Sequence, residues 1–230
     1  MSYTTNKTYP PAGGVLLLKN FMTDLISKHG GYKNLKSFQM AQIAYDLNFQ
    51  FCERFVPSHK MRDQMEGAGR GGAQNIGEGS RTSGTSKQSE LRLVNVARAS
   101  LDELKLDFEA YLRQRNLPIW DKNDNRVLKI RQLAYESNKS YTTYSSYFTD
   151  DVSFANCILC VINQANYLLD KQMLALNKDL AEKGDYKDRY KEVRKQAMLN
   201  QDPSYEDFLK KFNLKRLENG QVVKIDEDKE

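Results

Sequence analysis

Residues 91–112 read LRLVNVARASLDELKLDFEAYL, and this stretch decides the fold class. Its apolar residues recur at intervals of three and four, the spacing of one face of an α-helix. The predicted core-facing stripe contains Leu93, Val94, Ala97, Leu101, Leu104, Phe108, Tyr111 and Leu112. A weaker stripe on the opposite side contains Leu91, Ala99, Leu106 and Ala110. A helix with two apolar faces packs on both sides, so we predict a long, doubly covered helix over residues 87–115.

The segments on either side of this helix repeat the helical pattern. Residues 35–56 form an apolar-periodic stretch that Pro57 ends, because proline cannot continue a helix. A second stretch follows directly and gives way to the Gly-, Ser- and Thr-rich residues 80–86, which we predict as a loop. The last stretch, residues 152–183, ends at Gly184, a residue that suits a helix C-cap. The four long helices predict an all-α fold built on one four-helix bundle.

The remaining segments are predicted as shorter elements. Residues 125–135 suit a short helix, whereas the Ser-, Thr- and Tyr-rich residues 139–149 are predicted as a loop. After the last long helix, the sequence predicts a charged helix at 186–199, a short helix ending at Phe212 and a hairpin around Asn219-Gly220. We therefore divide the chain into an N-terminal arm with a short helix (1–31), the bundle (32–184) and a C-terminal helical and hairpin suffix (185–230) with an acidic tail that we expect to be disordered.

The composition is that of an intracellular chain with a modest positive charge. The net charge of +5, from 35 basic and 30 acidic side chains, permits nucleic-acid binding without demanding it. No apolar run approaches the ~20 residues that cross a bilayer. The apolar residues 15–18 are too few for the core of a signal peptide. We therefore expect a cytoplasmic protein that contacts no membrane.

Glycines crowd the second predicted helix, where residues 67–72 match the letters of the G-x-G-x-x-G dinucleotide motif. That motif needs a buried strand before it and a helix opening at it, but polar, helix-periodic residues precede it here. Each glycine inside a helix costs about 1 kcal/mol relative to alanine. We therefore favour close packing against a neighbouring helix over a cofactor site, and we expect no cofactor.

Two further patterns could carry chemistry. Cys157-x-x-Cys160 could be half of a metal or redox site. Zinc needs four ligands, however, and the sequence offers no matching pair. We therefore favour ordinary packing of the two cysteines and expect no metal. Asn75 and Glu78 could take part in acid–base chemistry, but no base or nucleophile is set beside them. We interpret them as hydrogen-bonding groups that close the end of the second helix, and we expect no catalytic residue and no enzymatic activity.

Basic residues form a line on the third predicted helix. Lys87, Arg98 and Lys105 share a narrow arc of the helical wheel, and Arg70, Arg81 and Arg92 lie nearby in sequence. One interpretation is a surface that contacts the phosphates of nucleic acid. The other is a solvated face stitched by i,i+4 ion pairs, for which Arg98–Asp102 and Lys105–Glu109 have the right spacing.

Several of these residues fall in blocks that resemble a known family. The blocks are Phe38-Gln39-Met40-Ala41, Gln64, Asn75-Ile76-Gly77-Glu78-Gly79-Ser80 and Ala97-Arg98-Ala99-Ser100-Leu101-x-Glu103. They resemble the bacterial four-helix-bundle proteins, which include proteins encoded within intervening sequences of 23S ribosomal RNA genes and the accessory variability determinant of diversity-generating retroelements. The structural-motif residues are Asn75, Glu78, Gly79, Ser100 and Glu103. The extension after Gly184 is similar to the suffix of some members.

The resemblance implies an antiparallel bundle that assembles into a barrel-shaped homopentamer. For the retroelement protein it also implies binding to nucleic acid and to a reverse transcriptase. The wide apolar arc of the first helix and the second stripe of the third are an independent reason to expect a homo-oligomer, because monomers seldom expose such patches.

Two functional hypotheses follow. The first is a non-catalytic oligomeric scaffold associated with nucleic acid, RNA rather than DNA, and accessory to a reverse transcriptase or an RNA-processing partner. The alternative is a structural or protein-interaction scaffold that touches no nucleic acid, with its charged faces serving solubility.

Overall fold

The computed structural model describes residues 29–200, 207, 209–210, 212–217 and 221–224. Within these residues the chain divides into two compact units, the first ending at Tyr186 and the second beginning at Lys187. The predicted N-terminal helix, much of the predicted short helix that ends at Phe212, the turn at Asn219-Gly220 and the acidic tail lie outside the described residues.

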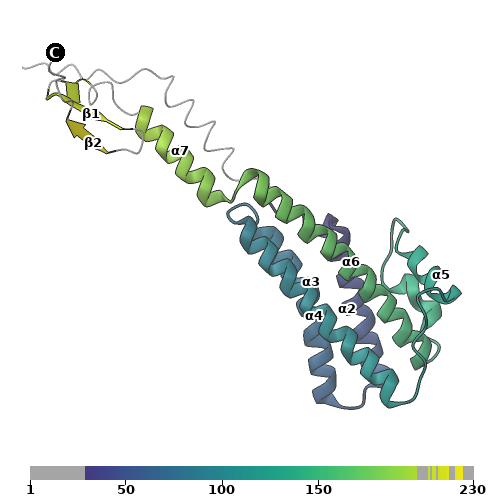
Figure 1. The fold of residues 1–230 in the computed structure, drawn as a ribbon. Coiled ribbons are helices and arrows are strands. Elements are labelled where there is room, and N and C mark those ends of the chain that lie inside the picture. Colours follow the sequence, from purple (N-terminus) through teal and green to yellow (C-terminus); the bar gives the residue numbers. More distant parts are fainter. Residues whose placement is uncertain (1–28, 201–206, 208, 211, 218–220, 225–230) are drawn as a thin grey trace, which may run out of the picture. The chain divides into compact units, whose positions relative to one another are not determined.

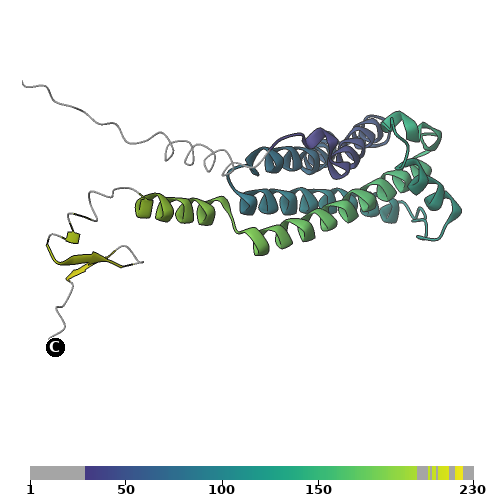
Figure 2. The same ribbon diagram turned by 90° about the horizontal axis from the view of Figure 1, so that it is seen from above.

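Helices dominate the described residues, so the prediction of an all-α fold class is confirmed. The long helices are α2 (Lys36–Phe55), α3 (His59–Thr82), α4 (Lys87–Gln114) and α6 (Asp151–Lys183). The shorter elements of the first unit are α5 (Asn125–Leu133) and the 3-10 helices η1 (Tyr32–Asn34) and η2 (Tyr141–Tyr147). The long helices lie side by side (Figure 1, Figure 2).

Local capping explains where the long helices begin and end. The Ser58 side chain accepts a hydrogen bond from the Met61 N–H at the start of α3, and Asp150 accepts one from the Ser153 N–H at the start of α6. Such side chains satisfy N–H groups that have no partner within the helix. At the end of α6, Gly184 has a φ of 65°, a conformation that glycine adopts without strain.

Each long helix packs against two others. Helix α2 contacts α3 and α6, and α4 also contacts α3 and α6. Neighbouring helices run in opposite directions, as the pairs between α4 and α6 show: Arg98 bonds Asp170, whereas Tyr111 bonds Asp151. The core is fully buried around Phe51, whose ring lies 5.0 Å from that of Phe108 and 5.6 Å from that of Phe154. Burial of such side chains is the main stabilising contribution, about 1.5–3 kcal/mol each.

Helix α6 has the composition of a core helix. The segment Asp151–Glu192 is, among the described residues, long and apolar enough to cross a membrane by length and composition, and 67% of its apolar window is buried within the fold. A buried helix at the centre of a fold passes the same test, so this segment is weak grounds for a membrane span. Every residue of the run Phe154–Ile162 is buried, and α6 contacts both α2 and α4.

Two sequence predictions are wrong in detail. Helix α3 continues to Thr82 instead of ending before Ser80, because Gly79 remains helical against α4 and the Ser83 hydroxyl bonds the Ser80 carbonyl. The predicted loop at residues 139–149 contains η2, whose start is held by a capping box between Ser140 and Thr143. Tyr144 is fully buried at its centre, which the polar composition of the segment conceals.

The second unit contains most of α7 (Tyr186–Asn200) and two short strands, β1 (Leu214–Arg216) and β2 (Val222–Lys224). The strands pair antiparallel with Lys215 opposite Val223, as the hairpin prediction requires. The Leu217 N–H donates to the Gln221 carbonyl at 2.8 Å and so extends the ladder toward the turn.

Candidate functional site

The glycines of α3 form its contact with α4. A Cβ placed on Gly72 would lie 2.5 Å from Leu101 Cδ2, and one on Gly79 would lie 3.3 Å from the Glu90 carbonyl oxygen. A side chain at Gly72 would require the Leu101 side chain to move, so Gly72 and Gly79 are used for close packing of α3 against α4. Gly67 has nothing within 4 Å of its Cβ position, so this glycine makes no such contact. All of residues 67–72 lie inside α3, where no strand precedes a phosphate-binding turn.

Of the structural-motif residues, Gly79 and Ser100 lie at the same α3–α4 interface. The Asn75 side chain donates to the Gly71 carbonyl at 2.8 Å. This bond lies within the helix, so the predicted role of Asn75 at the helix end is wrong. Ser100 packs on Gly71, with its Oγ 3.0 Å from the Cβ position of that glycine. Glu78 and Glu103 are exposed, one on each helix.

The three cysteines are buried and free. Burial raises the pKa of Cys160 to about 11 and that of Cys52 to about 12. A nucleophilic or metal-binding cysteine needs the thiolate, which these environments disfavour. Within the described residues no cluster of three or more His, Cys, Asp or Glu side chains could hold a metal. The cysteines therefore serve as small apolar packing groups.

Each member of the basic line on α4 has a carboxylate partner. We define the α4 basic line as Lys87, Arg98 and Lys105. Lys87 Nζ lies 3.3 Å from Glu90 and 3.8 Å from Asp179, and Lys105 Nζ lies 3.7 Å from Glu109.

Arg98 has the shortest contacts, 2.6 Å to both Asp102 and Asp170. The hydrogen bond with Asp170 raises the pKa of Arg98. The two predicted i,i+4 pairs are present, and partners from α6 add to them.

The other three predicted arginines lie in different surroundings. The Arg81 guanidinium lies 5.1 Å above the Tyr32 ring and donates to its hydroxyl at 3.2 Å. Arg70 and Arg92 are exposed, and no ion pair within the described part of the chain includes them. Lys87 and Arg98 of the α4 basic line pair with carboxylates of α6, whereas Arg81 packs on η1. The six predicted basic side chains therefore do not share one set of neighbours.

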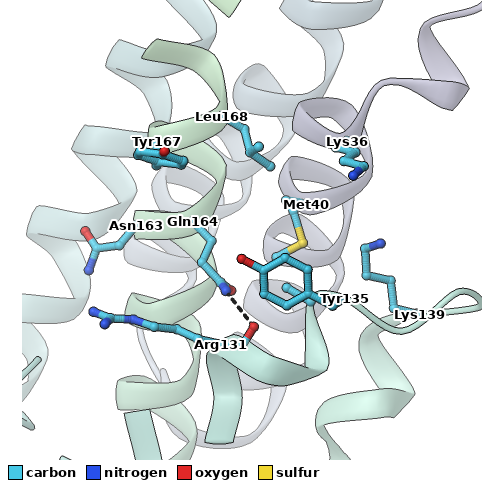
Figure 3. Close-up of a pocket in the computed structure, with 10 residues that line it drawn as sticks. Lys36, Met40, Arg131, Tyr135, Lys139, Asn163, Gln164, Tyr167 and Leu168 are labelled. Carbon is cyan, nitrogen blue, oxygen red and sulfur yellow. Dashed lines mark hydrogen bonds between the residues drawn. The ribbon is translucent and has the colours of Figure 1, made fainter. Parts of the chain in front are cut away.

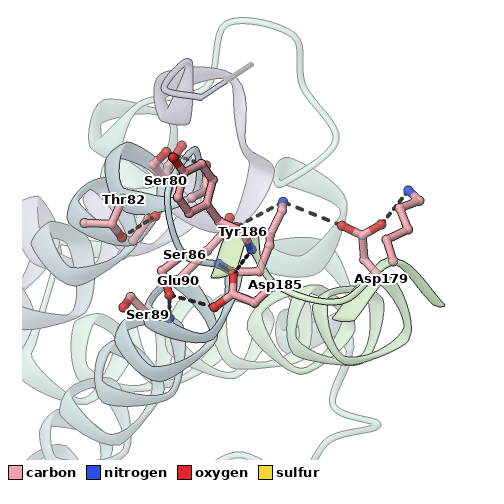
Figure 4. Close-up of polar contacts among 12 residues, drawn as sticks. Ser80, Thr82, Ser86, Ser89, Glu90, Asp179, Asp185 and Tyr186 are labelled. Atoms are coloured by element: carbon pink, nitrogen blue, oxygen red, sulfur yellow. Dashed lines mark hydrogen bonds and ion pairs between the residues drawn. The ribbon is translucent and has the colours of Figure 1, made fainter. Parts of the chain in front are cut away.

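A buried carboxylate that the sequence did not reveal holds the start of α4. Asp185 accepts hydrogen bonds from the Lys87 N–H at 2.8 Å, the Tyr186 N–H at 2.9 Å and the Ser86 hydroxyl at 3.1 Å (Figure 4). Burial opposes its ionisation, but these donors outweigh that effect and lower the pKa of Asp185. Asp185 thereby ties the end of α6 to the N-terminus of α4. Sequence inspection could not find it, because 98 residues separate it from Lys87.

One face of α4 carries apolar side chains without cover from the rest of the first unit. Val96 is 42% exposed and Leu106 is 63% exposed, with Ala99 exposed between them at helical spacing. Of the predicted second stripe, Ala99 and Leu106 are exposed, whereas Ala110 is half-buried and Leu91 packs against the core. Val96 was not part of that prediction. The chain matches no protein-family model, and no curated protein or solved structure is significantly similar to it.

Proposed function

We propose that this chain is a non-catalytic helical scaffold that assembles with copies of itself. The pairwise packing of four long helices, each opposite in direction to its neighbours, supports an antiparallel four-helix bundle as the framework. The blocks that resemble the bacterial four-helix-bundle family include Gly79 and Ser100, which both lie at the α3–α4 contact. Their position supports membership of that family, with α7 and the strand pair as its suffix.

The bare apolar stripe on α4 carries the proposal of self-association. Val96, Ala99 and Leu106 are exposed on one face of α4, with the exposed Glu103 between the last two, and exposed apolar patches mark interaction surfaces. A closed ring covers the stripe of every subunit, whereas an open chain leaves one bare at its end. The number of subunits that the resemblance implies, five, is the assembly we propose.

Light scattering on the purified chain tests this assembly. We expect a mass several times the 26.6 kDa of one chain. Leu106→Glu should reduce it to that of a single chain, because a charge would be buried in the interface. Leu174→Glu is the matched control, since Leu174 is 64% exposed on α6 and should leave the mass unchanged. A single-chain mass for the wild type at micromolar concentration refutes the proposal.

We further propose that the scaffold associates with nucleic acid, RNA rather than DNA, in the cytoplasm, as an accessory to a reverse transcriptase or an RNA-processing partner. The exposed Arg70, which has no ion pair within the described residues, supports this partner. Arg92 is also exposed but lies one helical turn before Val96, on the face proposed for self-association. Exposed ion pairs such as Lys105–Glu109 contribute only about 0–1 kcal/mol, so a phosphate can displace the carboxylate. A ring repeats these charges by symmetry and makes the surface multivalent.

Retention of RNA on the immobilised protein at increasing salt measures this association. We expect binding that depends weakly on sequence and falls steeply with salt, because each neutralised phosphate releases counterions. The combined variant Lys87→Glu, Arg98→Glu, Lys105→Glu should lose retention while the assembly persists. Wild-type protein that retains no RNA at low salt, or a variant that binds equally well, contradicts the association.

A scaffold that contacts no nucleic acid is the second candidate. The observation that favours it is the carboxylate partner of each residue of the α4 basic line, since paired charges serve solubility and helix stability. Absence of 260 nm absorbance in the protein purified at low salt, together with collapse of the assembly in the triple variant, identifies these residues as structural ion pairs.

A further inference from the structure

A cavity of about 460 Å³ opens between α2, α5 and α6 (Figure 3). This volume lies within the roughly 300–1,000 Å³ of small-molecule sites in proteins. Met40 and Leu168 contribute apolar surface, and polar groups surround it. The lining residues come from segments near residues 36–40, 131–139 and 163–168, so only the fold brings them together.

The cavity is lined by cations without carboxylates. Lys36, Arg131 and Lys139 line it, and among the described residues no Asp or Glu does. Nor does any ion pair in the described part of the chain include these three side chains. Figure 3 shows Lys36 and Lys139 on one side of Tyr135 and Arg131 on the other. Three uncompensated positive charges around one cavity repel one another and attract an anion.

A hydrogen bond holds Gln164 beside the cavity, since its Nε2 donates to the Arg131 carbonyl at 3.1 Å. Its Oε1 has no hydrogen-bond partner among the described residues and is closed to solvent, so a ligand in the cavity does not reach this atom. Gln164 therefore adds polar lining to the cavity without a free acceptor.

Two tyrosines supply aromatic surface at the cavity. Tyr135 is 86% exposed and Tyr167 is 61% exposed, and the Lys171 ammonium lies 5.5 Å from the centroid of the Tyr167 ring. Aromatic side chains of the core, such as Phe51 and Tyr144, are in contrast fully buried. Exposed aromatic rings beside cations favour a flat ring that stacks on them while its anionic group reaches the lysines.

We propose that this cavity binds a small aromatic anion, the chemistry of a mononucleotide. The ring contacts Tyr135 and Tyr167, and the phosphate lies near Lys36 and Lys139, which Figure 3 shows on the same side of Tyr135. The site uses none of the residues of the α4 basic line, and it does not depend on the proposed association with RNA.

Calorimetric titration of the full chain with adenosine 5′-monophosphate tests the site. Adenosine has the ring without the anion, and ribose 5-phosphate has the anion without the ring. We expect each of these to bind at least tenfold more weakly than the nucleotide, because each lacks one of the recognised groups. Equal affinity for all three, or no binding of the nucleotide up to millimolar concentration, overturns the proposal.

Two variants at the cavity localise the binding. Lys36→Glu should weaken the nucleotide at least tenfold, and Tyr135→Ala should weaken it roughly tenfold through lost stacking. Lys129→Glu and Leu128→Ala change exposed α5 residues that do not line the cavity, so both should bind as the wild type does. Circular-dichroism melting of each variant checks that the fold is intact. Cavity variants that melt normally and bind like the wild type refute the assignment.

Failure of this site is distinguishable from failure of the RNA association. Tyr135→Ala leaves the α4 basic line, Arg70 and Arg92 unchanged, so its retention of RNA should equal that of the wild type. Loss of RNA retention in Tyr135→Ala would mean that the cavity holds one nucleotide of an RNA strand, which overturns the independent small-molecule site.

Discussion

The α4 basic line and the cavity between α2, α5 and α6 contain the same types of side chain in opposite electrostatic situations. On α4, Arg98 contacts two carboxylates at 2.6 Å, and Lys87 and Lys105 each have at least one. At the cavity, Lys36, Arg131 and Lys139 have none among the described residues. The difference teaches that a line of basic residues in a sequence says little about free charge, because neighbouring helices supply the partners.

The helix contacts beneath the two regions also differ. Helix α4 packs on the glycines of α3, where a Cβ at Gly72 would meet the Leu101 side chain, whereas α2, α5 and α6 leave a cavity between them. Concave sites of this kind suit a small ligand. The predictions below test this contrast, beginning with the largest expected effect.

Of the changes predicted here, replacing Gly72 by valine should lower the free energy of unfolding most, because it disturbs the contact between α3 and α4. The new Cβ would meet Leu101 at 2.5 Å, and overpacking of this kind costs about 1–3 kcal/mol, to which a β-branched side chain at a helix contact adds strain. Urea denaturation measures the loss. Gly67→Ala is the matched control: no atom lies within 4 Å of its Cβ position, so alanine should stabilise the helix by up to about 1 kcal/mol. Equal effects of the two changes would contradict the close α3–α4 contact.

Reversing one charge should lower the stability of the fold on the α4 basic line but not at the cavity. Arg98→Glu places a third carboxylate beside Asp102 and Asp170 and should cost about 1–2 kcal/mol, discounted for the partial exposure of these side chains. Lys36→Glu should leave the stability unchanged or raise it slightly, because it relieves repulsion at the cavity. Denaturation at low and high salt compares the two, and salt should shrink both effects. Destabilisation by Lys36→Glu as large as that by Arg98→Glu would show that Lys36 has a carboxylate partner.

Periodicity predicted the long helices because each buries a continuous apolar face, and local signals predicted several of their ends. Pro57 and Gly184 act through the backbone of their own segment, so the sequence contains the whole cause. The end of α3 was misplaced because Gly79 and Ser80 have the composition of a loop, while a contact with α4 keeps them helical. Residues 139–149 were misjudged for a similar reason, since the burial of Tyr144 depends on its neighbours in space.

The candidate sites were less predictable than the helices. Spacing on one helix gave Arg98–Asp102, but the second partner, Asp170, comes from a segment 72 residues away. The cavity draws on three separate segments, and neither Lys36 nor Gln164 belongs to a motif. Contacts between helices decide which charges are neutralised, and such contacts leave no periodic signal in one sequence.

Removal of the Asp185 carboxylate should have a smaller effect, confined to the start of α4. Asp185→Ala leaves the Lys87 N–H and the Ser86 hydroxyl without their acceptor, and loss of a helix cap costs about 0.5–2 kcal/mol. A chain that ends at Gly184 should lose about the same amount relative to one that ends at Tyr186, yet remain helical. Thermal melting of both truncations measures this, and equal melting temperatures would show that Asp185 does not hold α4.

The pH dependence of the same contact can be worked out from its ionisation. Because the folded pKa of Asp185 lies below its ordinary value of 3.8, the stabilising contribution of the carboxylate is fully present above about pH 4. It is lost as the pH falls through the folded pKa, where the carboxylate takes up a proton and accepts the Lys87 and Tyr186 N–H groups less strongly. Asp185→Asn cannot ionise, so comparison with this variant separates the effect of Asp185 from that of other acids. One of these is Glu90, because burial raises its pKa. The difference in unfolding free energy between wild type and Asp185→Asn should stay constant from pH 7 to 5 and shrink below pH 4. A difference that grows on acidification would mean that the protonated form of Asp185 holds the start of α4.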